Sequence, residues 1–180
     1  MQLMKWTAMA ALSFSALTAG ADEPRLAINL LAEGQVDIDR PATDVWPYIV
    51  DTNSWKPNRP MVHHSGPVGQ LGEVFAIVSP QRRDQIWFLA ENVELVPNKR
   101  RTIKLLDLKG DLLGYAVWRL AENQGKTSID YQILAESRVM PEQKLTAEQV
   151  AEMQRKGYTD NKQRVDDEFV ELKRRLEAGK

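Results

Sequence analysis

The two histidines of the chain, His63 and His64, are adjacent in the sequence. Imidazole is the side chain that most often moves a proton near neutral pH, and it is a common metal ligand. Neighbouring residues of a strand point to opposite faces of a sheet, so these two cannot readily share one metal ion or one substrate proton. A metal site would also need carboxylate ligands, because the chain contains no cysteine. We therefore expect two ordinary strand residues, and we predict no metal site.

Covalent catalysis and phosphate binding find little support in the motifs. No serine lies in a Gly-x-Ser-x-Gly elbow, the strained turn that presents a nucleophilic hydroxyl. Gly66, Gly69 and Gly72 are regularly spaced, but no Lys-Ser or Lys-Thr follows, and the next element is a predicted strand. The anion-binding geometry of a helix N-terminus is thus missing. These glycines predict a turn between strands.

One carboxylate, Glu91, falls on the predicted inward face of a strand. This face would also carry Trp87, Leu89, Val93 and Leu95. A buried carboxylate is costly unless it is paired or protonated. Glu91 would then be either a polar contact for a ligand or half of a structural ion pair.

Apolar residues of three predicted strands share the side of the sheet that a helix would cover. They are Phe75 and Ile77, Trp118 and Leu120, and Ile129, Tyr131 and Ile133. Aromatic residues at strand spacing usually fill a core. Tyr131, however, brings a hydroxyl that needs a partner, and the covering helix has Gly157 and Asn161 in its apolar stripe. A small residue and an amide facing the sheet suit a hollow with one polar contact point.

The elements that position these residues are mainly strands. Residues 34–39 alternate as a half-buried strand does, and Pro41 then opens a helix over residues 42–50, whose first turns Pro47 should distort. Residues 51–60 form a turn or a short second helix around Trp55. Further strands are predicted over residues 61–65, 73–79, 85–96, 101–106, 112–121 and 127–136. The turns between them indicate an antiparallel meander.

The end of the chain changes to a helical period. Thr146 and Gln149 form a capping box, and apolar or small residues then recur at three- and four-residue steps. This stripe consists of Val150, Met153, Gly157, Asn161, Val165, Phe169, Leu172 and Leu176. The helix is long unless Gly157 breaks it. It is the only predicted element long enough to cover the sheet, and a straight helix on a curved sheet can leave an apolar hollow.

Several short motifs, in this order, carry a resemblance to a known family. They are residues 38–46 (IDRPATDVW), Asp51 followed by Trp55 and Pro57, Leu71-Gly72, residues 93–100 (VELVPNKR), Trp118-Arg119-Leu120 and residues 172–177 (LKRRLE). The chain resembles the helix-grip superfamily of START-like (SRPBCC) domains, which includes plant pollen allergens and bacterial polyketide cyclase/dehydrase-like proteins. Two features depart from that family: Pro47, and the N-terminal segment, since many relatives are cytoplasmic.

The resemblance implies an α+β fold. A curved antiparallel sheet of about six or seven strands would wrap around the long C-terminal helix, with two short helices after the first strand. The predicted ligand contacts in the cavity between sheet and helix are Phe75, Trp87, Glu91, Trp118, Tyr131, Gly157 and Asn161.

The first 21 residues have the pattern of a cleavable export signal. Met1–Lys5 carry a positive charge, residues 6–17 are apolar apart from three hydroxyl residues, and Ala19-Gly20-Ala21 offers the small residues that a signal peptidase reads. The apolar run is shorter than the roughly 20 residues of a spanning helix. We expect cleavage after Ala21, a single helix-grip domain over residues 22–180, a periplasmic or secreted location and no stable membrane insertion.

The charges are nearly balanced, with 24 basic and 25 acidic residues and a net charge of −1. Nothing in this balance points to nucleic acid or an anionic membrane as a partner. The favoured function is an exported protein that encloses a small hydrophobic molecule, lipid-like or aromatic, without a cofactor.

Two alternatives remain. The resemblance alone implies a polyketide cyclase- or dehydratase-like enzyme, for which Glu91, Tyr131 and the two histidines are the candidate acids and bases. The other alternative is a protein-interaction module of the envelope, which would use the sheet edge or the Arg82-Arg83 turn.

Overall fold

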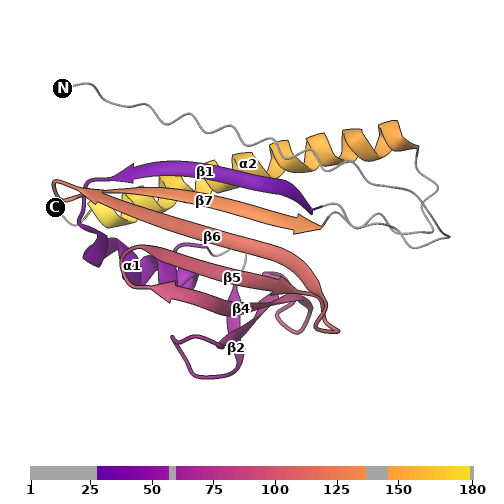
Figure 1. The fold of residues 1–180 in the computed structure, drawn as a ribbon, viewed down its shortest axis with the longest axis horizontal. Helices are drawn as coiled ribbons and strands as arrows, with labels where there is room; N and C mark the ends of the chain where they lie inside the picture. The colour runs from indigo at the N-terminus through magenta and orange to yellow at the C-terminus, as the bar shows by residue number, and fades with distance from the viewer. Residues whose placement is uncertain (1–27, 57–59, 137–145, 179–180) are drawn as a thin grey trace.

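A computed structural model shows a seven-stranded antiparallel sheet that curves against one long helix (Figure 1). The structure describes residues 28–56, 60–136 and 146–178, so the predicted export signal lies outside the described residues. The elements are β1 (Ile28–Ile38), α1 (Ala42–Val50), the 3-10 helix η1 (Thr52–Ser54), β2 (Met61–Ser65), β3 (Val74–Val78), β4 (Ile86–Val96), β5 (Arg100–Leu106), β6 (Leu112–Asn123), β7 (Lys126–Glu136) and α2 (Ala147–Glu177).

The strand order is β1-β7-β6-β5-β4-β3-β2, and every neighbouring pair is antiparallel. Strands β2 to β7 follow one another as a meander, and β1 closes the order by pairing with β7. This arrangement confirms the predicted α+β class and the predicted meander. The short helices α1 and η1 come directly after the first strand, as expected.

The curvature of the sheet has local causes. Register shifts interrupt the pairings β1–β7, β2–β3, β3–β4, β4–β5 and β5–β6, and such bulges bend a strand and increase its twist. In β6, a Cβ at Gly114 would lie 2.1 Å from the carbonyl oxygen of Leu134. A glycine is therefore needed where β6 passes close to β7. The result is a concave inner face (Figure 1).

Helix α2 is continuous, so Gly157 does not break it. The predicted capping box is present: the Thr146 hydroxyl accepts a hydrogen bond from the Gln149 amide at 3.2 Å, and the Gln149 side chain accepts one from the Thr146 amide at 2.8 Å. The buried residues of α2 are Val165, Phe169, Leu172 and Leu176, all in its second half. The first half extends past the ends of the strands (Figure 1).

Helix α1 is continuous across Pro47, whose carbonyl accepts a hydrogen bond from the Asp51 amide at 2.9 Å. The expected distortion of its first turns is therefore not severe enough to break the helix. Within the described part of the chain, no helix has the combination of length and apolar composition that crossing a bilayer requires.

Candidate ligand cavity

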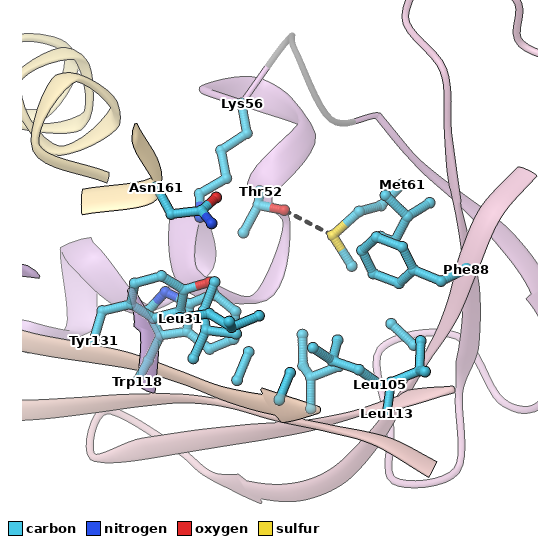
Figure 2. A pocket seen from close by; sticks show the side chains of 16 residues that line it. Leu31, Thr52, Lys56, Met61, Phe88, Leu105, Leu113, Trp118, Tyr131 and Asn161 are labelled. Carbon is cyan, nitrogen blue, oxygen red and sulfur yellow. Dashed lines mark hydrogen bonds between the residues drawn. The ribbon is translucent and has the colours of Figure 1, made fainter. Parts of the chain in front are cut away.

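A cavity of about 310 Å³ lies between the inner face of the sheet, η1 and α2 (Figure 2). Its apolar wall consists of Leu31, Met61, Ile77, Phe88, Ala90, Ile103, Leu105, Leu113, Ala116, Ile133 and Ala135, with the rings of Trp118 and Tyr131. Thr52, Lys56 and Asn161 complete the lining. At the packing density of a protein interior this volume holds roughly a dozen non-hydrogen atoms, which is the size of a small ligand.

Small side chains on the sheet account for the hollow. Ala90 on β4, Ala116 on β6 and Ala135 on β7 all line it, and each is almost fully buried. A larger residue at any of these positions would project into the space under α2. Helix α2 offers only Asn161 to the lining, because its large apolar residues begin one turn later, at Val165.

Three of the seven predicted contact residues line the cavity: Trp118, Tyr131 and Asn161. The predicted inward face of the last hairpin is confirmed, since Trp118 and Tyr131 are buried with their rings 4.5 Å apart. Phe75 lies on the same side of the sheet, but its ring packs 5.5 Å from the Arg101 guanidinium, outside the lining. Gly157 is half-buried and also lies outside the lining.

The predicted inward face of β4 is wrong for Trp87 and Glu91. Phe88 and Ala90 line the cavity instead, and the Trp87 side chain is 42% exposed. The cause is a bulge between Asn92 and Glu94, which shifts the alternation of the strand by one residue. The alternation of side chains that is correct after the bulge therefore assigns the residues before the bulge to the wrong face of the sheet.

The two histidines lie on the edge strand β2 and are exposed, and the described cavity lining includes neither. His63 Nδ1 lies 3.0 Å from Oε1 of Glu73, a buried carboxylate whose Oε2 accepts a hydrogen bond from the Gly69 amide. This contact connects β2 with the turn before β3, so His63 has a structural role at the edge of the sheet. Among the described residues, no group of three histidine or carboxylate side chains is placed to hold a metal ion.

Lys56 is a cavity residue that the sequence patterns did not reveal. Its ammonium lies over the rings of Trp55, Tyr131 and Trp118, at 4.5, 4.9 and 5.3 Å from their centroids. The same nitrogen lies 3.0 Å from Oε2 of Glu168. Both side chains are nearly buried, with exposures of 9% and 11%. The segment from Asp51 to Pro60 has no periodicity, so nothing in the sequence marks this lysine as inward-facing.

The carboxylate of Glu168 is shared between two cations. Its Oε1 accepts a hydrogen bond of 2.7 Å from Arg164, and its Oε2 faces Lys56. Burial by itself would raise the pKa of Glu168, but the charges of Lys56 and Arg164 outweigh burial and hold this pKa below its ordinary value. Glu168 is therefore ionised at neutral pH, and Lys56, Glu168 and Arg164 form a charge cluster beside the cavity.

Arg101 on β5 is a second buried cation that the sequence analysis missed. Its side chain is fully buried and donates to Asn92 Oδ1 at 2.9 Å and to the carbonyls of Ile49 and Val50 at 2.6 and 3.0 Å. It thereby satisfies the last carbonyls of α1. Burial lowers the pKa of Arg101 to about 10, and the attraction of Glu73 opposes this shift, so the guanidinium stays charged at neutral pH.

No model of a known protein family matches the chain, and no curated protein sequence matches it. Solved structures do match. A Staphylococcus aureus protein of unknown function, SA2116, superposes with a TM-score of 0.62 at 10% identity, over 82% of this chain and 94% of that one. The Polyketide_cyc-like protein Cgl2372 from Corynebacterium glutamicum gives 0.54 at 16% identity, over 87% and 95%. Ara h 8.0201 gives 0.52 at 13% identity, over 83% and 98%.

These likenesses, at low identity but over nearly the whole of each domain, concern the fold. Together with the strand order and the long C-terminal helix they show that the chain has the helix-grip fold, as the sequence motifs predicted.

Proposed function

We propose that the protein is an exported binding protein that encloses one small apolar molecule between the sheet and α2. The cavity of about 310 Å³ carries this proposal, since thirteen of its sixteen lining residues are apolar or aromatic. Export rests on the sequence pattern of residues 1–21. The walls of the cavity are held in place by the hydrogen bonds of the sheet and by the buried residues that pack α2 against it.

The size of the cavity sets the contribution that apolar burial makes to affinity. A ligand of roughly a dozen non-hydrogen atoms removes about 300 Å² of apolar surface from water, which is worth about 7 kcal/mol at about 25 cal/mol per Å². A free energy of about 7 kcal/mol corresponds to a dissociation constant of about 10 μM. The loss of translational and rotational freedom weakens this value further, so a polar contact must add to apolar burial if binding is to be tight.

The first test is to purify the protein from its native host and to measure its mass under native and denaturing conditions. We expect a stoichiometric apolar molecule that is present in the native spectrum and released on denaturation. A protein that arrives empty, and that also fails to bind any apolar probe of this size, would contradict the proposal.

A matched pair of variants on β6 tests whether the cavity is the binding site. Ala116→Leu projects into the cavity, whereas Val117→Leu adds one methylene to the opposite, outer face of the same strand. We expect Ala116→Leu to weaken binding of an apolar probe at least tenfold and to change the free energy of unfolding by less than about 1.5 kcal/mol, because it fills existing space. Val117→Leu should leave binding unchanged, and equal effects of the two variants would place the site elsewhere.

Export is tested separately. We expect the full chain, expressed with residues 1–21, to be recovered outside the cytoplasm with its N-terminus at Asp22, as read by intact mass. Recovery of the uncleaved chain in the cytoplasm would contradict export, but it would not contradict the proposed binding function.

A further inference from the structure

The two ends of the cavity differ in chemistry. At one end Lys56 and Asn161 approach each other above the rings of Tyr131 and Trp118 (Figure 2). At the other end the wall is formed by hydrocarbon and aromatic side chains, among them Phe88, Leu105, Leu113 and Met61 (Figure 2). The remaining polar side chain of the lining that lies toward this end, Thr52, donates its hydroxyl hydrogen to Met61 Sδ at 2.9 Å. A ligand that fills this space would therefore meet the ammonium and the amide at one end only.

The polar end is positively charged. Lys56 is the one ionisable lysine, arginine or carboxylate among the described lining residues. Its neighbour Glu168 lines a separate hollow on the other side of Lys56, together with Arg164, and this carboxylate is shared between the two cations. That hollow also carries Asp160, Asp167 and Glu171, but none of these carboxylates lines the cavity. Of all these charged groups, the one that faces the cavity is the Lys56 ammonium.

Asn161 adds a hydrogen-bond donor at the same end. Its Oδ1 accepts a hydrogen bond of 3.4 Å from the Arg164 guanidinium. A guanidinium has donors only, so the branch of the amide that faces it must be the oxygen, and the NH₂ group is the other branch. The amide extends into the cavity beside Lys56 (Figure 2). The polar end thus combines a cation with an amide donor, and both groups favour an oxygen acceptor that carries negative charge.

We propose that the natural ligand is an apolar molecule with a single terminal carboxylate. The carboxylate lies between Lys56 and Asn161, and the apolar body extends toward Leu105 and Leu113. The Lys56 ammonium is already held by Glu168 and by three aromatic rings, so little side-chain entropy is lost when the carboxylate binds. This inference rests on the proposed function, since it names the class of molecule that the cavity takes.

The test compares three probes of one chain length: decanoate, 1-decanol and decyltrimethylammonium. Each is titrated by calorimetry at pH 7.5 and low salt into the mature protein after its own ligand has been removed. We expect decanoate to bind at least tenfold more tightly than decanol, and the cation to bind more weakly than either. In Lys56→Met this preference should fall to less than threefold while decanol still binds, and Lys56→Arg should keep the preference for decanoate.

The outcomes separate the two proposals. Equal affinity for decanoate and decanol in the unaltered protein would overturn the carboxylate inference and leave the binding function intact. No binding of any probe would contradict the proposed function itself.

A measurement without variants covers the case in which Lys56→Met does not fold. The carboxyl carbon of ¹³C-labelled decanoate reports its own ionisation by NMR. Binding beside the ammonium should shift that titration to lower pH than in free decanoate, because a nearby cation favours the charged carboxylate. A shift to higher pH would show that the carboxyl group is buried away from Lys56, and it would overturn the inference.

Discussion

The two halves of α2 have the same sequence period but opposite surroundings. In the second half, Val165, Phe169, Leu172 and Leu176 are buried. Of the described residues 147–160, none is buried, and Met153 of the same predicted stripe is 52% exposed. The difference shows that the period of the helix selects the face that points toward the sheet, whereas the extent of the sheet decides how much of that face is covered.

The cavity lies where these two halves meet. Asn161 is the last residue of the predicted stripe before the buried series begins at Val165, and it lines the cavity. The second half of the helix therefore holds the fold together, and the first half adjoins the space in which we propose that a ligand binds. The following predictions test this division, and they run from the largest expected effect to the smallest.

Phe169→Ala and Met153→Ala remove one large side chain from each half. Phe169 is 3% exposed and packs against Trp55 and Tyr131, so its truncation should lower the free energy of unfolding by about 3–5 kcal/mol. Met153→Ala should change it by less than about 0.5 kcal/mol. Urea denaturation measures both values. Similar losses in the two variants would mean that the halves do not differ in packing.

Gly34→Ala tests how closely the second half approaches β1. A Cβ at Gly34 would lie 2.5 Å from Cγ1 of Val165 and 3.1 Å from Cε2 of Phe169, so the helix or these side chains must move. We expect a loss of about 1–3 kcal/mol in the free energy of unfolding, the usual cost of overpacking a core. A neutral effect in thermal and urea denaturation would show that α2 lies further from the sheet than described.

The pH dependence of stability tests the charge cluster at the boundary. Because the pKa of Glu168 is below its ordinary value in the folded protein, its charge stabilises the fold above the ordinary carboxyl pKa of about 4.3, and this contribution is lost as the pH falls through the lowered pKa. Glu168→Gln should therefore be less stable than the unaltered protein near pH 7, and the gap should narrow toward pH 3. Urea denaturation at a series of pH values measures this difference in the free energy of unfolding. A difference that stays constant with pH would show that the charge of Glu168 does not contribute to stability.

Gly157→Ala is the matched counterpart of Gly34→Ala in the first half of α2. A Cβ at Gly157 would meet nothing within 4 Å, and alanine favours a helix interior over glycine. We expect a gain of up to about 1 kcal/mol in the free energy of unfolding, with unchanged affinity for an apolar probe. A loss of stability would reveal a contact at this position that the first half is not expected to make.

Most of the fold could be predicted because its signals are local. The strands from β2 to β7 follow from alternation and turn residues, and the capping box at Thr146 correctly marked the start of α2. The sequence motifs also indicated the helix-grip arrangement.

The cavity lining was harder to predict because it depends on events that leave no period in the sequence. A bulge after Asn92 reversed the phase of β4, and Lys56 follows η1 in a stretch of sequence that has no period. The position of Arg101 could have been inferred, since it lies on the same face of β5 as Ile103 and Leu105. However, it directly follows Arg100, and two adjacent arginines usually indicate a solvent-exposed turn.

The capping box at Thr146 has a consequence for motion. The first turns of α2 contain no buried residue and are held by their own backbone and by this cap. The hydrogen bond of 2.9 Å from Tyr158 to Glu33 lies further along the helix. The amide hydrogens of the first turns should exchange with solvent through local opening, far faster than those near Phe169, whose exchange requires global unfolding. A molecule bound against Asn161 would extend the slowly exchanging region toward the N-terminus of α2. Amide exchange rates measured along the helix would show which residues a bound molecule protects.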